Sequence, residues 1–190
     1  MKNSINVREL EISGLYEVTR EVRKDSRGDF ARLYGVDDLS PTIWPWPIGQ
    51  VNLSRTEKSG TVRGIHFQVP PYTEAKLVCC VKGRLWDVAV DLRRQSKTYL
   101  QHLGLELSAS QANALLIPPG FGHGFQTLED ETEIVYIHSS PYQAKSDTGI
   151  SPFDKSINII WPREATAVSP RDLGLPAMDS AFKSLDLENR

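Results

Sequence analysis

The chain has 190 residues, a formal net charge of −2 and an isoelectric point near 6.1. This length is typical of one domain, and it allows a core that needs neither a disulfide nor a metal to fold. The weakly acidic balance argues against a protein that binds nucleic acid or a membrane surface. We therefore expect a single domain over residues 1–190 with neither of these partners.

Targeting features and cysteine use indicate the cytoplasm. The N-terminal residues lack the apolar segment of a signal peptide, and no run approaches ~18 apolar residues. Cys79 and Cys80 are adjacent in a strand-like run, where neighbours point to opposite faces. We interpret them as two small apolar residues in a reducing compartment, and we expect a soluble, cytoplasmic protein.

The first quarter of the chain has only weak signals of secondary structure. Residues 1–13 are mostly polar, and within them residues 7–10 are a candidate for a short helix. Alternation of residue types predicts a first strand over residues 14–22. Residues 25–29 form a turn cluster. Residues 37–49 concentrate proline and tryptophan, which excludes a helix interior and a central strand, so we predict an ordered loop with an aromatic surface.

From Gln50 to Ser139 the pattern is β throughout. Short apolar runs predict strands over residues 76–81, 84–91, 99–107, 112–117, 123–128 and 133–138. The first two meet at Lys82-Gly83, which predicts a tight hairpin because glycine tolerates a positive φ. Many short strands with turns between them indicate a β-sandwich or barrel. Strand character is lost after Trp161-Pro162, and residues 178–188 are the candidate for one short helix.

Three residues near the start of this β region carry the strongest chemical signal. Arg63 presents a planar fork of donors that holds phosphate, and His66 takes a proton near neutral pH. Lys76 neutralises a developing oxyanion. This set suggests proton abstraction beside a carbonyl on a substrate that carries phosphate. In an ideal strand Arg63 and His66 face opposite sides, so Gly64 must provide a bend for both to reach one ligand.

Each candidate also has a structural interpretation. His66 can be a buried, hydrogen-bonded histidine, and Lys76 can be a solvated strand end. An aromatic residue in a strand, such as Tyr136, is usually core packing, but in a pocket it can act as a general acid. His123, at a strand start, fits a structural role as well as a substrate contact. Asp172 becomes relevant only as a carboxylate that orients a histidine.

The sequence lacks the ligand pattern of a cupin metal site. Small β-barrels often hold a metal through a His-x-His pair, a carboxylate and a later histidine. Here the first pair reads His66-Phe67-Gln68, and glutamine is a poor ligand for zinc or iron. We therefore expect no catalytic metal.

Several motifs occur in a fixed order over roughly residues 14–176. They cover residues 25–30, 50–54, 60–68, 75–78, 83–94, 117–125, 133–136, 159–162 and 169–172. In this order and spacing the chain resembles the dTDP-4-dehydrorhamnose 3,5-epimerase family. The resemblance implies an all-β cupin fold, a jelly-roll or double-stranded β-helix barrel with short terminal helices. It also implies an isomerase that needs no cofactor.

The family chemistry assigns a role to four residues. His66 is the base, held by Asp172, and Tyr136 returns a proton from the opposite face of the sugar ring. Lys76 steadies the enolate oxygen that forms from the 4-keto group. This is self-consistent, because a ketone at C4 acidifies the hydrogens at C3 and C5, and reprotonation on the other face inverts the carbon.

The resemblance further implies a nucleotide-sugar substrate and a homodimer. The substrate-binding residues would be Arg27, Phe30, Gln50, Asn52, Arg63, His123, Tyr142 and Arg171. Arg27 and Arg63 would bind the diphosphate, and Tyr142 would stack on the nucleobase of the nucleotide sugar. The segment around Arg27 and Phe30 would lie near the neighbour's site.

Some positions depart from the family pattern. Arg32 stands where the family usually has glutamate, Arg171 where it has lysine and Phe153 where it often has tryptophan, and the loop at residues 41–49 is unusual. These differences leave the proton chemistry intact but bear on the substrate. Conversion of dTDP-4-dehydro-6-deoxyglucose to dTDP-4-dehydrorhamnose is the first hypothesis. Epimerisation at C3 or C5 alone, on another dTDP-, CDP- or GDP-sugar, is the alternative.

Three other functions fit the same fold. A ketoisomerase that moves the carbonyl from C4 to C3 needs a histidine base but no tyrosine acid. A metal-dependent cupin oxygenase would carry a metal. A sugar-binding cupin would gain nothing from a base and an acid, and the set of His66, Asp172, Tyr136 and Lys76 argues against it.

Overall fold

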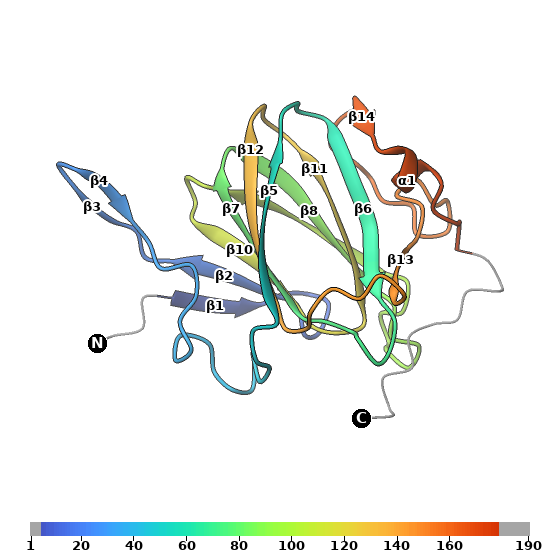
Figure 1. The fold of residues 1–190 in the computed structure, drawn as a ribbon, viewed down its shortest axis with the longest axis horizontal. Coiled ribbons are helices and arrows are strands. Elements are labelled where there is room, and N and C mark those ends of the chain that lie inside the picture. The colour runs from blue at the N-terminus through green and yellow to red at the C-terminus, as the bar shows by residue number, and fades with distance from the viewer. Residues whose placement is uncertain (1–4, 179–190) are drawn as a thin grey trace.

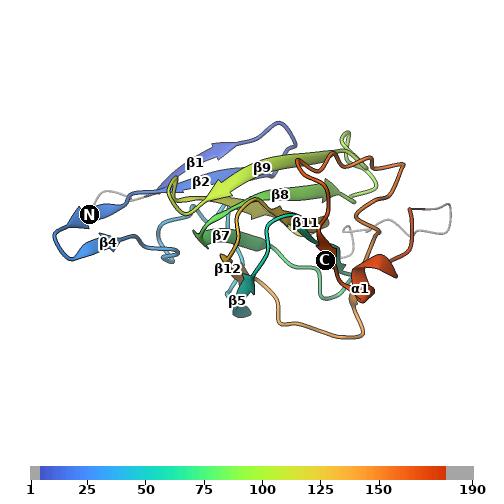
Figure 2. The same ribbon diagram turned by 90° about the horizontal axis from the view of Figure 1, so that it is seen from above.

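The computed structural model describes residues 5–178, which form a sandwich of two β-sheets. One sheet has the order β1 (Ile5–Glu9), β2 (Tyr16–Arg20), β10 (Asn113–Ile117), β7 (Lys76–Lys82), β12 (Thr132–His138) and β5 (Gln50–Thr56). The other has the order β13 (Asp147–Gly149), β6 (Thr61–Gln68), β11 (Phe121–Thr127), β8 (Arg84–Asp91) and β9 (His102–Ser108), with β14 (Ala167–Val168) beside β6. A separate hairpin of β3 (Arg23–Asp25) and β4 (Gly28–Phe30) projects on the side away from helix α1 (Pro170–Leu173), as both Figure 1 and Figure 2 show.

The chain crosses repeatedly from one sheet to the other. From β5 to β8 each successive strand lies in the opposite sheet, and the same alternation recurs from β9 to β13. This is the jelly-roll arrangement of a cupin, so the predicted fold class is confirmed. The predicted strands between residues 76 and 138 are also present, with ends shifted by at most three residues. No helix within residues 5–178 is long and apolar enough to cross a membrane.

The predicted hairpin at Lys82-Gly83 is wrong. β7 pairs with β10 and β12, whereas β8 pairs with β11 and β9 in the other sheet. Gly83 has a φ of +75° and turns the chain from one sheet into the other. A glycine with positive φ serves a hairpin and a sheet-to-sheet corner equally well, so the turn residues alone do not reveal which strands pair.

Predictions for the N-terminal region also need correction. The helix predicted at residues 7–10 is wrong, because Val7 lies in β1 and pairs with Val18 of β2. Four residues are too few for their apolar period to separate helix from strand. The first predicted strand shortens to Tyr16–Arg20, and the turn cluster at residues 25–29 is the tip of the β3–β4 hairpin.

Near the C-terminus, the two-residue strand β14 follows Trp161-Pro162, where no strand was predicted. Apart from Met178, the helix predicted at residues 178–188 lies outside the described residues.

Three apolar layers stabilise the sandwich. The inner layer lies between the sheets and combines Val78 of β7 with Leu85 and Ala89 of β8. The loop that precedes β5 covers the outer face of the first sheet, and the segment after β13 covers that of the second. Trp44 in the first of these loops is only 5% exposed, so the predicted aromatic surface is largely turned inward. Burying such a ring stabilises the fold by roughly 1.5–3 kcal/mol.

Candidate active site

A cavity of about 320 Å³ opens between the two sheets. Side chains of β5, β7 and β12 line it from the first sheet, and side chains of β6 and β11 from the second. Eight of the residues predicted for the site line this cavity: Gln50, Asn52, Arg63, His66, Lys76, His123, Tyr136 and Tyr142. The structure therefore brings most of the predicted site together at one place, from segments far apart in the sequence.

A bend in β6 directs Arg63 and His66 into the same cavity. The pairing of β6 with β11 shifts register between these two residues. Gly64 lies within the shift with a φ of +115°, and a Cβ at this position would lie 2.6 Å from the Cα of Gly124. Only a glycine fits such a close approach of two backbones with a positive φ. The bend that the sequence required at Gly64 is present.

His66 forms a pair with Asp172. The distance from His66 Nε2 to Asp172 Oδ1 is 2.6 Å, and the other carboxylate oxygen accepts a hydrogen bond from the backbone N–H of Gly64 at 3.3 Å. Asp172 lies in helix α1, whose N-cap Ser169 accepts a hydrogen bond from the Asp172 N–H. A carboxylate only accepts hydrogen bonds, so His66 carries its proton on Nε2 and its Nδ1 is free to act as a base.

The surroundings of His66 keep it neutral. Burial lowers the pKa of His66, and the Asp172 carboxylate opposes this effect. The positive charges of Arg171 and Lys76 lower the pKa further. The side chain is still 29% exposed, so it combines a desolvated ring with access from the cavity. A neutral, accessible imidazole can accept a proton near neutral pH.

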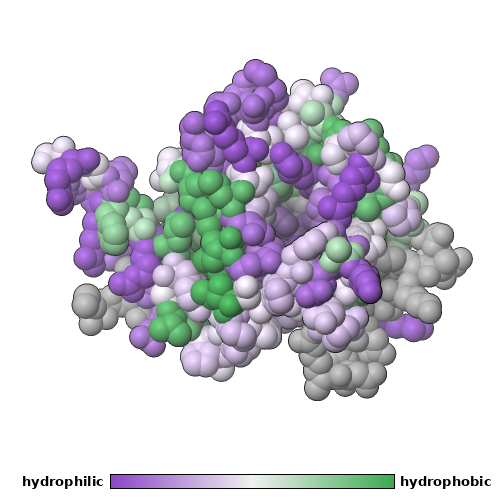
Figure 3. Space-filling view, viewed as in Figure 1, coloured by the Kyte–Doolittle hydropathy of each residue, from purple (hydrophilic) through white to green (hydrophobic). Residues whose placement is uncertain are grey.

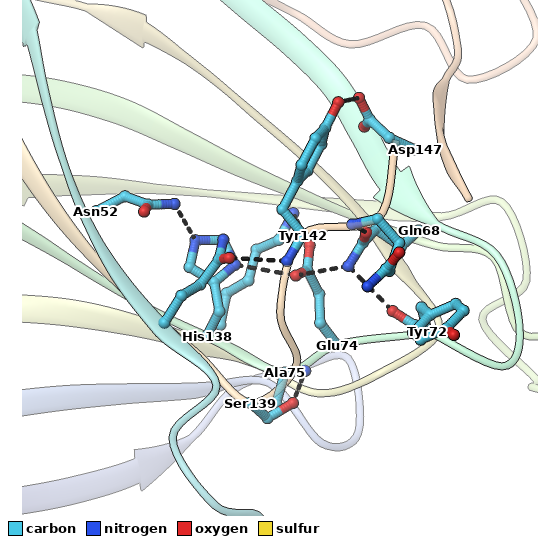
Figure 4. A network of polar contacts seen from close by, with 12 residues as sticks. Asn52, Gln68, Tyr72, Glu74, Ala75, His138, Ser139, Tyr142 and Asp147 are labelled. Atoms are coloured by element: carbon cyan, nitrogen blue, oxygen red, sulfur yellow. Dashed lines mark hydrogen bonds and ion pairs between the residues drawn. The ribbon is translucent and has the colours of Figure 1, made fainter. Parts of the chain in front are cut away.

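Lys76 is not a solvated strand end. It begins β7, only 7% of it is exposed, and its Nζ lies 3.2 Å from Oε1 of Glu74. The Glu74 carboxylate also accepts hydrogen bonds from His138 Nδ1 at 3.0 Å and from Gln68 Nε2 at 3.1 Å. Figure 4 shows this network around Glu74, with Asn52 beside His138. A buried ammonium held by a carboxylate is a fixed positive charge in the cavity wall.

Tyr136 faces the cavity from β12, in the sheet opposite His66. Its ring lies edge-on to His123, with 6.1 Å between the ring centroids. Burial raises the pKa of Tyr136 well above its ordinary value, and the negative charge of Asp87 adds to the effect. The phenol is therefore protonated at neutral pH and can donate its proton to a carbanion.

His123 is paired with a buried carboxylate. Its Nε2 lies 2.7 Å from Oδ1 of Asp87, which has no exposed surface. The other oxygen, Oδ2, has no hydrogen-bond partner among the described residues. Burial raises the pKa of Asp87, and His123 opposes this effect. The pair holds the His123 ring against the cavity wall.

Polar groups at the cavity mouth are linked through Asp147. Tyr142 donates its hydroxyl to Asp147 Oδ2 at 3.1 Å, and Arg171 reaches the same oxygen with Nη2 at 2.5 Å. The backbone N–H of Tyr142 also donates to Gln50 Oε1 at 2.7 Å. Tyr142 is 56% exposed, so it is accessible for stacking. Arg171 contacts the same carboxylate as Tyr142 but does not line the cavity.

Arg27 and Phe30 lie apart from the other predicted residues. Both belong to the β3–β4 hairpin, where Arg27 is bound to Asp25 at 2.6 Å and Phe30 is 67% exposed. The hairpin stands away from the sandwich in Figures 1 and 2. Within one chain the structure does not bring them to the cavity.

Sequence reasoning missed Glu74 and His138, which line the cavity beside Lys76 and Tyr136. A signal was available for His138, because it follows Tyr136 by two positions in one strand and so shares its face. Glu74 precedes β7 and carries no such signal.

Among residues 5–178 no three His, Cys, Asp or Glu side chains gather as a ligand set. Gln68, at the His-x-His position, donates to Glu74 and accepts from the Gln143 N–H.

A jelly-roll fold with a histidine–aspartate pair, a lysine and a buried tyrosine around one cavity defines a carbohydrate isomerase of the cupin class. A family model described as dTDP-4-dehydrorhamnose 3,5-epimerase matches residues 9–180. The chain belongs to this family, and it is an epimerase of a nucleotide-linked 4-keto-6-deoxy sugar.

Individual relatives cover most of the chain. The dTDP-4-dehydrorhamnose 3-epimerase of Streptomyces niveus is 40% identical over 88% of this chain and 81% of its own length. The dTDP-4-dehydrorhamnose 3,5-epimerase of Shigella flexneri is 38% identical over 89% and 93%.

Solved structures of epimerases are also similar to this chain. A 4-keto-6-deoxy sugar epimerase from the novobiocin cluster of Streptomyces spheroides has a TM-score of 0.86 and 38% identity, covering 91% of this chain and 87% of that one. The dTDP-6-deoxy-D-glucose-3,5-epimerase of Legionella pneumophila, in complex with dTDP-4-keto-L-rhamnose, also has a TM-score of 0.86, at 31% identity and 91% and 92% coverage.

Proposed function

We propose that the chain converts dTDP-4-dehydro-6-deoxyglucose to dTDP-4-dehydrorhamnose, with His66 as the base and Tyr136 as the acid. The observation that carries this proposal is their placement: His66 and Tyr136 belong to opposite sheets and line one cavity. A sugar ring between them has a proton acceptor on one face and a donor on the other, which is what inversion at carbon requires.

Lys76 completes the chemistry. Removing the hydrogen at C3 or C5 gives an enolate whose negative charge lies on the C4 oxygen. The buried ammonium of Lys76 is a preorganised charge for that oxygen, and such charges act most strongly where water is excluded. Arg63 at the rim, only loosely held by Thr56 at 3.2 Å, is available for the diphosphate.

NMR in D₂O tests the proposal. The 4-keto sugar is incubated with wild-type protein and with His66→Ala, and deuterium is followed at each carbon. Deuterium at both C3 and C5, lost in His66→Ala, is the expected result. Deuterium at one carbon only would show a single-site epimerase, the activity that the name of the Streptomyces niveus relative gives. No exchange with dTDP-, CDP- or GDP-sugars would contradict the proposal.

We further propose that the protein is a cytoplasmic homodimer. The edge strand β5 exposes Val51 and Leu53, and Figure 3 shows a hydrophobic stripe in this part of the surface. An apolar, unpaired sheet edge favours association with a second copy. The projecting β3–β4 hairpin would then reach the neighbour, which explains why Arg27 and Phe30 lie far from their own cavity. Buried free Cys79 and Cys80 fit a reducing compartment.

A complementation experiment tests the shared site. Arg27→Ala and His66→Ala are each expected to be inactive alone. If Arg27 serves the neighbouring cavity, mixed dimers contain one cavity with both residues intact, and mixing restores activity. If Arg27 serves its own chain, mixing restores nothing. Light scattering on each variant establishes the oligomeric state independently.

A further inference from the structure

Glu74 and His138 form a third histidine–carboxylate pair at the cavity, beside His66–Asp172 and His123–Asp87. His138 Nδ1 lies 3.0 Å from Glu74 Oε2, and both side chains are nearly buried, at 10% and 8% exposure. Both line the cavity, and His138 lies two positions from Tyr136 on the same face of β12. The mechanism proposed above uses His66, Tyr136 and Lys76 and gives this pair no role.

The Glu74 carboxylate fixes which nitrogen of His138 carries the proton. Glu74 accepts from Lys76, His138 and Gln68. Burial raises the pKa of Glu74, but His138 and Lys76 together lower it below its ordinary value, so the carboxylate is ionised. An ionised carboxylate cannot donate, so Nδ1 of His138 is protonated. In the neutral ring Nε2 is then a hydrogen-bond acceptor.

Beside this acceptor stands a donor. The amide nitrogen of Asn52, on β5, lies 3.4 Å from His138 Nε2, as Figure 4 shows. This distance is longer than a good hydrogen bond, so the contact is weak and easily exchanged for a ligand. A hydroxyl group both donates and accepts, and it therefore matches an acceptor and a donor placed side by side.

The chemistry of the substrate singles out one hydroxyl. A 4-keto-6-deoxy sugar carries ring hydroxyls at C2 and C3. The C3 hydroxyl changes face when C3 is inverted, so a fixed pair of groups cannot hold it in both epimers. C2 keeps its configuration throughout. The C2 hydroxyl is therefore the group that a rigid site can hold from substrate to product.

We propose, on the basis of the function proposed above, that His138 and Asn52 together bind the C2 hydroxyl of the sugar, with Glu74 as the positioning residue for His138. The pair makes the enzyme selective for sugars that retain this hydroxyl. A site built to hydrogen-bond a hydroxyl discriminates against the analogue that lacks it, because its buried polar groups are then left unpaired.

The test compares two substrates in several variants. kcat/KM is measured with dTDP-4-keto-6-deoxyglucose and with its 2-deoxy counterpart. We expect wild-type protein to prefer the hydroxylated sugar at least about tenfold, and His138→Ala and Asn52→Ala to bring the ratio toward one. His102→Ala is the matched control, because His102 lies on β9 and does not line the cavity. It should keep the wild-type ratio.

Glu74→Gln provides a second variant in case His138→Ala does not fold. A glutamine amide can donate to Nδ1, which allows the ring to carry its proton on Nε2 and removes the acceptor. The ratio should again fall. A wild-type ratio near one, or a ratio unchanged in His138→Ala and Glu74→Gln, would overturn the inference while leaving the epimerase function in place. If wild-type protein exchanges deuterium on neither sugar, the proposed function itself fails.

Discussion

His66 and Asp172 lie 106 residues apart in the chain, yet their side chains meet at 2.6 Å. The contact depends on α1, a single turn whose Ser169 cap and Pro170 start place Asp172 over β6. The same carboxylate accepts a hydrogen bond from the Gly64 N–H, so it links the bend in β6 to the orientation of the His66 ring. This pair is thus both a structural link and the means by which His66 presents Nδ1 to the cavity.

Asp172→Asn tests that function. An asparagine amide can donate to Nε2, and the ring then carries its proton on Nδ1, where the base must be free. We expect kcat to fall by about 100- to 10,000-fold, the contribution of a positioned general base. Asp154→Asn is the matched control, since Asp154 is also buried and binds backbone N–H groups but does not line the cavity. A similar fall in that control would indicate general destabilisation instead.

The pH dependence of kcat/KM should report the neutral form of His66. Because burial lowers the pKa of His66, activity should rise with pH through a midpoint below the ordinary histidine value of ~6.5. Arg171 contributes to this lowering, so Arg171→Ala should move the acid limb to higher pH. Asp172 acts in the opposite direction, and any residual activity of Asp172→Asn should extend to lower pH. Acid limbs that do not move in either variant would assign the titration to another group.

Tyr136→Phe separates proton removal from inversion. Phenylalanine keeps the ring contacts with His123 and His138 but has no proton to return. We expect deuterium to enter the starting sugar through His66 while formation of the inverted product falls by about 100-fold or more. Because burial raises the Tyr136 pKa, wild-type protein should show no alkaline loss of activity from this group below pH ~10. Intact turnover in Tyr136→Phe would favour the ketoisomerase instead.

The sequence predicted the strands between residues 76 and 138 but not which strands pair. Along β8, Trp86, Val88 and Val90 alternate with Leu85 and Ala89, and the two sets lie in different apolar layers, as a period of two requires. Alternation within a strand does not indicate which other strand pairs with it, so the predicted hairpin of β7 and β8 was wrong. The strand β1 was missed because its structure comes from pairing with β2.

In the candidate site, too, local features could be predicted from the sequence but contacts between distant segments could not. Arg63, Gly64 and His66 are close in sequence, and their need for a bend could be deduced from strand geometry alone. The contact of His66 with Asp172 joins distant segments, and only the resemblance to a family suggested it. Glu74 was not predicted as a site residue because a carboxylate before a strand is usually exposed. The burial of Glu74 depends on three partners from three segments.

Gly64→Ala tests whether the bend in β6 is essential. Gly64 combines a φ of +115° with a site where a Cβ would lie 2.6 Å from Gly124 Cα and 2.8 Å from the His123 carbonyl oxygen. Backbone strain and overpacking should together lower the free energy of unfolding by about 3–5 kcal/mol, measured by urea denaturation. Gly28→Ala is the control, because Gly28 also has a positive φ, +133°, but a Cβ there meets nothing within 4 Å. It should cost only the strain, about 1–2 kcal/mol. Equal losses in the two variants would mean that the close approach of β6 and β11 can relax, and that Arg63 and His66 are held together by other contacts.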